Sequence, residues 1–142
     1  MSRAALLAVA AALLAGACAK RVVPPVPEGE DYVAPVAAPG EVSPGEAKEL
    51  RSAWLDVLAG DATAAARGYE KLLRRREGLV PARVGLGYAR LRAGRREEAA
   101  AAFEAALGVR PDDVPALVGA GSTSFRRGDL DAAIGFYRRA QA

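Results

Sequence analysis

Three sets of small and aromatic residues recur every 34 positions along the chain. Each set holds a glycine, an alanine five positions later and an aromatic residue four positions after that. The sets are Gly60, Ala65 and Tyr69; Gly94, Ala99 and Phe103; and Gly128, Ala133 and Tyr137. The residues between them are mostly helix formers, and internal repeats of this length are built from stacked helical hairpins. The sequence therefore predicts an all-α domain.

The composition supports helices and excludes several kinds of chemistry. Hydrophobic residues make up 51% of the chain and aromatic residues only 6%, which suits close packing of helices better than a β-sandwich. With no histidine and one cysteine, the chain lacks the residues for a zinc site, a disulfide framework or a histidine-activated nucleophile. The acidic pairs Glu97-Glu98 and Asp112-Asp113 are adjacent in sequence, at helix starts or turns where acids are favoured electrostatically. We expect no metal, no cofactor and no enzymatic activity.

The charge is unevenly distributed. Residues 22–45 carry four acids and no base, whereas residues 46–142 carry 17 Lys and Arg against 13 Asp and Glu. This surplus is far from the concentrated basic stripe of a nucleic-acid-binding protein. We expect no nucleic-acid partner.

Residues 1–17 have the pattern of an export signal. Arg3 is followed by an uncharged run, Ala4 to Ala15, and then by the small residues Gly16 and Ala17. The run is shorter than the ~20 residues of a membrane-spanning helix, although an uncleaved anchor stays open as an alternative. The lone Cys18 would be a free thiol in an exported protein unless it has a use.

The stretch from Leu14 to Cys18, LAGAC, resembles a bacterial lipoprotein signal. The resemblance implies that Cys18 is acylated and becomes the first residue after cleavage. Ala15 departs from the pattern, because leucine is usual there. Ala19, where aspartate would imply retention in the inner membrane, implies an outer-membrane lipoprotein facing the periplasm. A cleaved signal that yields a secreted or periplasmic protein is the alternative.

Residues 18–45 form a linker rich in proline, glycine and acidic residues. Proline does not propagate a helix and favours extended backbone, so we expect a semi-rigid, solvated arm. A ligand for a proline-recognition module is the less favoured interpretation.

Residues 46–142 are expected to form three hairpins, at about 46–79, 80–113 and 114–142. Glycines at the 34-residue spacing should form the turn within each hairpin, and small residues should let the helices approach. The predicted turn and packing residues are Gly60, Ala65, Tyr69, Gly87, Gly94, Ala99, Phe103, Ala106, Gly121, Gly128, Ala133, Tyr137 and Ala140.

These residues and their period resemble the tetratricopeptide repeat family. The resemblance implies a short right-handed α-solenoid whose first helices line a groove for an extended peptide or a partner helix. The residues that it places along the groove are Leu50, Arg51, Trp54, Leu58, Val84, Tyr88, Arg92, Val118, Ser122 and Arg126. This apolar, aromatic floor with arginines at its edge suits a hydrophobic segment with an acidic end. Trp54 and Tyr88 are expected to be exposed in one row.

The function favoured by these patterns is a lipid-anchored scaffold of the cell envelope that binds a partner protein or peptide, in secretion, pilus or outer-membrane assembly. One alternative is a self-assembling module, because the last repeat has no following helix to cover Ile134 and Tyr137. An accessory part of an envelope enzyme is the least favoured alternative.

Overall fold

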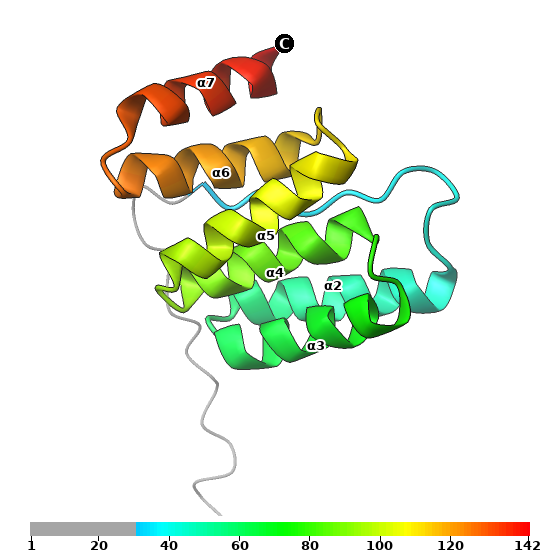
Figure 1. Ribbon diagram of the computed structural model, residues 1–142. Helices are drawn as coiled ribbons and strands as arrows, with labels where there is room; N and C mark the ends of the chain where they lie inside the picture. Colours follow the sequence, from blue (N-terminus) through cyan, green and yellow to red (C-terminus); the bar gives the residue numbers. More distant parts are fainter. Residues whose placement is uncertain (1–30) are drawn as a thin grey trace, which may run out of the picture.

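The computed structural model describes residues 31–142, and this part of the chain contains six helices and no strand (Figure 1). The predicted signal peptide and Cys18 lie outside the described residues. The helices are α2 (Pro44–Leu58), α3 (Ala62–Arg75), α4 (Val80–Arg92), α5 (Arg96–Val109), α6 (Val114–Arg126) and α7 (Leu130–Gln141). No helix within residues 31–142 is long and apolar enough to span a bilayer.

The helices form three stacked hairpins, α2 with α3, α4 with α5, and α6 with α7 (Figure 1). Each helix packs against the next one along the chain, and α4 also contacts α2 and α6. The first helices of the hairpins therefore lie side by side and form one face of the stack. This arrangement confirms the predicted all-α solenoid of helical hairpins.

Local sequence explains where the helices begin and turn. The side chain of an aspartate caps three of them by accepting a hydrogen bond from the backbone N–H three residues later. These caps are Asp61 on α3, Asp113 on α6 and Asp129 on α7. The turns within the hairpins contain Gly60, Gly94 and Gly128, whose φ angles of 78°, 75° and 81° are readily adopted only by glycine.

The ring of Phe103 lies between α4 and α6, and two glycines make room for it. Phe103 is fully buried. A Cβ atom on Gly87 of α4 would lie 2.6 Å from Phe103 Cε1, and one on Gly119 of α6 would lie 2.4 Å from the same atom. Equivalent close approaches join Tyr69 to Gly85 and Tyr137 to Gly121. The rings thus pack on helix backbones, and the roles of Gly85 and Gly119 were not predicted from the sequence.

Candidate binding groove

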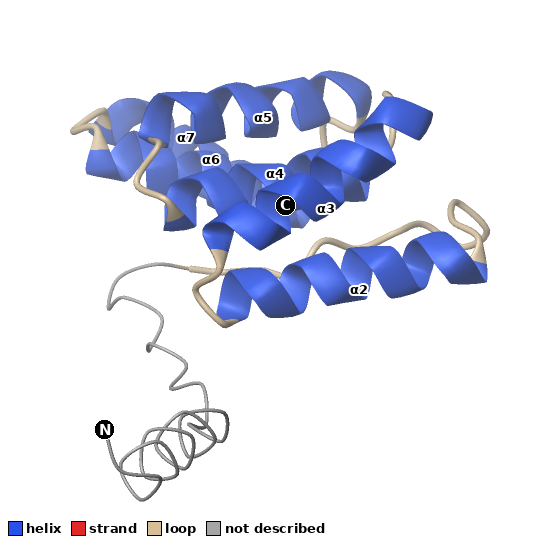
Figure 2. Cartoon of the chain, turned by 90° about the horizontal axis from the view of Figure 1, so that it is seen from below, coloured by secondary structure: helices blue, strands red, loops and turns tan. Residues whose placement is uncertain are grey.

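Residues 31–42, which we call the strap, lie along the face formed by α2, α4 and α6 (Figure 1). The strap runs beside α2, and a turn at Gly40 then reverses the chain into that helix (Figure 2). Tyr32, Val33 and Val42 pack against the hydrophobic core. The expectation of a solvated arm is therefore wrong for Tyr32, Val33 and Val42, which are partly buried, whereas other residues of the strap, such as Val36, are exposed.

Tyr88 lies beneath the strap and joins several elements. Its ring centroid is 5.5 Å from that of Tyr32, 5.6 Å from Trp54 on α2 and 4.9 Å from Phe103 on α5. Its hydroxyl donates a 2.8 Å hydrogen bond to the carbonyl oxygen of Pro115 on α6. Burial raises the pKa of Tyr88 above its usual value, although a backbone hydrogen bond from Val33 opposes the rise. Tyr88 and Trp54 are neighbours as expected, but the expectation that Tyr88 is exposed is wrong, because it is 0% exposed.

Two arginines hold the end of the strap through Glu41. Arg110 donates to the Glu41 carboxylate at 2.8 Å and to the carbonyl oxygen of Val36 at 3.3 Å. It also pairs with Asp113 at 3.1 Å. Arg76 donates to the Glu41 carbonyl oxygen at 2.9 Å. These charge-assisted contacts attach the strap to the loops before α4 and α6.

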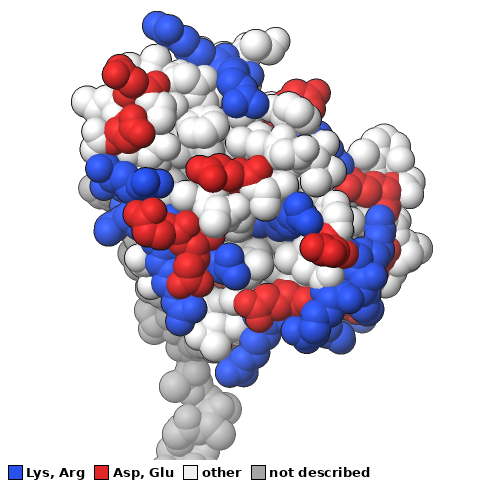
Figure 3. All heavy atoms as spheres, viewed as in Figure 1, with Lys and Arg blue, Asp and Glu red and all other residues white. Residues whose placement is uncertain are grey.

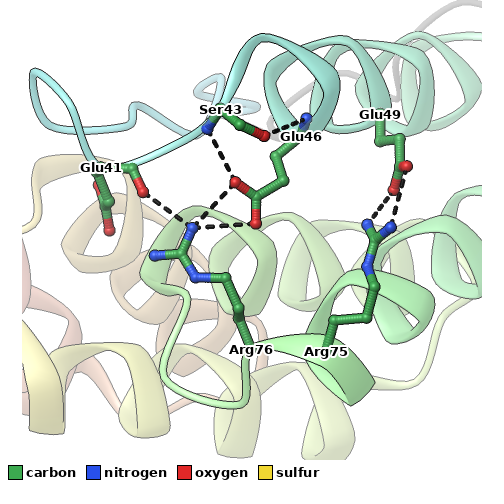
Figure 4. A network of polar contacts seen from close by, with 6 residues as sticks. All are labelled: Glu41, Ser43, Glu46, Glu49, Arg75 and Arg76. Carbon is green, nitrogen blue, oxygen red and sulfur yellow. Dashed lines mark hydrogen bonds and ion pairs between the residues drawn. The ribbon is translucent and has the colours of Figure 1, made fainter.

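A second polar cluster fixes the start of α2 beside the strap (Figure 4). Ser43 and Glu46 form a capping box, in which each side chain accepts a hydrogen bond from the other residue's backbone N–H. Arg76 pairs with Glu46 at 3.0 Å, and Arg75 pairs with Glu49. The Ser43 backbone hydrogen bond, followed by the hydrogen bond from Arg76, lowers the pKa of Glu46 from 4.5 to about 2.

The lowered pKa predicts an acid-sensitive contribution of Glu46 to stability. A carboxyl group whose pKa is lower in the folded state stabilises the fold above its unfolded pKa, and this contribution is lost as the pH falls through the folded value. Glu46→Gln should therefore lower the melting temperature at pH 7, and the difference from the parent should shrink between pH 4.5 and about pH 2. Circular dichroism melts across this range measure it, with exposed Glu104→Gln as the control. A constant difference across the range would contradict the charge effect.

The strap leaves clefts on both sides. One, of about 250 Å³, lies between Ala34 and Ala37 of the strap and Leu50, Arg51 and Trp54 of α2. The other, of about 370 Å³, lies between the strap and the start of α6. The small strap side chains therefore do not fill the groove.

The structure places the ten predicted groove residues in three environments. Leu50, Arg51 and Trp54 line the first cleft. Four residues are partly exposed: Leu58, Arg92, Val118 and Arg126. Three residues are buried: Val84, Tyr88 and Ser122.

Arg76, Arg110 and the strap were not predicted from the sequence. The available signal was an apolar Tyr32-Val33 pair within an otherwise acidic, proline-rich stretch. Nothing in that pair identifies the surface that it covers.

Opposite charges are mixed on the face drawn in Figure 3. Arg90 and Arg95 lie near Glu98, and Arg127 pairs with Glu97 at 3.4 Å. Acidic and basic side chains are therefore interspersed around these pairs, whereas basic side chains gather at the lower right of the view in Figure 3.

A family model described as tetratricopeptide repeat matches residues 84–142, from within α4 to the end of the last hairpin. A search of curated proteins found no match to the chain. The family match and the stacked hairpins support the prediction of tetratricopeptide repeats. Such repeats generally mediate protein–protein interaction, which is consistent with a scaffold or adaptor.

Proposed function

We propose that this chain is a non-enzymatic adaptor, lipid-anchored in a bacterial cell envelope, that holds a partner protein through an extended peptide in the groove of α2, α4 and α6. The strap is the observation that carries the proposal. An extended segment already lies in the groove, with an aromatic ring against Tyr88 and a carboxylate on Arg110. The partner segment should therefore be extended and apolar, with an acidic residue toward one end.

The proposed location depends on the N-terminal sequence. The LAGAC stretch supports acylation of Cys18, and Ala19 supports the outer membrane, facing the periplasm. Because a single acyl chain binds membranes only marginally, the two or three chains of a bacterial lipoprotein would give a durable anchor. Secretion, pilus and outer-membrane assembly are the settings in which such an adaptor would work.

The last helix offers a second surface, but its fit to another copy is poor. Leu130 and Ile134 of α7 are exposed, which favours the self-assembly alternative. In a head-to-tail stack, α2 of the next copy would cover α7. Arg51 occupies the position on α2 that corresponds to Gly85 and Gly119 in the repeat. Its long side chain would meet the Tyr137 ring where glycine is needed, so we favour the adaptor.

Site-specific photo-cross-linking in the native host tests this function. A photoreactive amino acid at Leu50, in the cleft, should give one discrete protein adduct, whereas one at Leu55, exposed elsewhere on the same helix, should give none. The Leu50 adduct should disappear in a Cys18→Ala background, and the protein should leave the membrane fraction.

Two results would contradict parts of the proposal separately. Equal adducts from Leu50 and Leu55 would remove the groove as the binding surface. Continued membrane retention of the Cys18→Ala variant would remove the lipid anchor and leave the groove assignment intact.

A further inference from the structure

We propose that the strap is an autoinhibitory occupant of the groove, which a partner peptide with larger apolar side chains at the positions of Ala34 and Ala37 displaces. The inference rests on the proposed function, because it takes the groove to be the site of partner binding. It adds a closed state, in which residues 31–42 block that site, and an open state, in which they have left it.

The strap covers buried residues without being buried itself. Tyr88 is 0% exposed beneath it, whereas no strap residue is buried and Val36 is 60% exposed. A fully buried core residue has contacts on all sides, whereas every strap residue keeps an accessible side. The strap is thus a cover with one contacting side, and its departure would expose Tyr88 and Trp54.

The polar contacts that hold the strap include a backbone hydrogen bond from Val33 to Tyr88 and a group of contacts at Glu41. Glu41 receives hydrogen bonds from Arg110 and Arg76, while Val36 contributes one carbonyl oxygen to Arg110. Glu41 also accepts a hydrogen bond from the backbone N–H of Ala38. Loss of the Glu41 carboxylate would therefore remove the strap's ion pair and one contact within its turn.

The fit of the strap to the groove is incomplete. Ala34 and Ala37 border the cleft of about 250 Å³ beside Leu50 and Trp54. A peptide with leucine at these two positions would bury additional methyl groups against the same apolar wall. Its buried apolar surface would therefore be larger than that of the strap. A partner segment with this larger buried surface would displace the strap, although the two have a similar backbone and charge.

Covalent attachment explains how a poorly fitting strap stays in place. Only Ser43, the N-cap residue, separates it from α2, and a short connection gives an effective concentration in the millimolar range. Weak contacts then suffice to keep the groove mostly closed. A peptide in solution binds with an apparent affinity reduced by the fraction of molecules that are open.

The test uses full-length protein and a fluorescein-labelled peptide of residues 31–42 that carries Ala34→Leu and Ala37→Leu. The opened variant is Tyr32→Ala with Glu41→Ala. The matched control, Glu49→Ala, also breaks a glutamate–arginine pair, but that pair joins α2 to α3 and does not involve the strap. Fluorescence polarisation should show binding to the opened variant at least about tenfold tighter than to the parent or the control.

Trp54 is the only tryptophan and borders the cleft, so its emission reports the strap directly. A red shift is expected in the opened variant and not in Glu49→Ala. A second variant, Ala37→Leu in the intact chain, should fill the cleft and bind the peptide more weakly than the parent. This variant tests whether the strap blocks the groove without removing a contact that stabilises the fold.

The contrary outcomes identify which proposal fails. Equal binding to parent and opened variant, abolished in both by Leu50→Glu, would mean that the groove binds peptide and the strap does not block it. An unchanged Trp54 emission in the opened variant, or unchanged peptide binding by Ala37→Leu, would also overturn the inference. A red-shifted opened variant that binds no peptide would overturn both the inference and the groove as a peptide site.

Discussion

Gly119→Ala is expected to destabilise the domain when Phe103 is present and to stabilise it slightly when Phe103 is replaced by alanine. In the parent, the new Cβ would lie 2.4 Å from the buried ring, and such overpacking costs about 1–3 kcal/mol. Phe103→Ala alone should cost about 3–5 kcal/mol. In that background the collision is gone, and replacing a helical glycine with alanine gains about 0.5–1 kcal/mol.

Urea unfolding of the two single variants and the double variant measures this coupling. Gly135→Ala is the matched control, because Gly135 also lies inside a helix but nothing lies within 4 Å of its added Cβ. It should have the same small effect in both backgrounds. Additive effects of Gly119→Ala and Phe103→Ala would show that the ring does not lie against α6.

Tyr88→Ala is expected to cost about 3–5 kcal/mol of unfolding free energy. Its ring contacts aromatic residues from the strap, α2 and α5, and is fully buried. Tyr88→Phe keeps the ring contacts and loses the hydrogen bonds of the hydroxyl with Pro115 and Val33, so it should cost about 1–2 kcal/mol. The same urea experiment measures both variants.

Phe125→Ala provides the comparison for an exposed aromatic residue, since this side chain is largely exposed on α6. It should change the free energy of unfolding by less than about 0.5 kcal/mol. A Tyr88→Ala variant as stable as Phe125→Ala would mean that Tyr88 is accessible, as the sequence first indicated, and not part of the core.

The hairpin architecture was predictable because its main packing residues recur at one period. Phe103 and its equivalents fill the space within a hairpin, and a 34-residue comparison finds them directly. Gly85 and Gly119 were harder to identify because they accept rings from the preceding hairpin. That contact depends on how α3 packs against α4 and how α5 packs against α6, and the repeat length in the sequence does not specify this packing.

The strap could not be placed from sequence for a related reason. Proline content correctly disfavoured helix for residues 31–38, but composition does not say whether such a segment is solvated or bound. Glu41 and Arg110 are 69 positions apart, and no pattern in either neighbourhood links them. The exposure of Tyr88 was mispredicted because the residue that covers it, Tyr32, was assigned to the solvated arm.

The docked strap also shortens the distance that the domain could extend from a membrane. With an anchor at Cys18, 13 residues separate the anchor from Asp31, and a chain of this length spans at most roughly 45 Å. Release of the strap would move the start of the docked chain from Asp31 to Ser43, and 25 residues span at most roughly 85 Å. The same event that uncovers the groove would nearly double the radius within which a tethered domain can search for its partner.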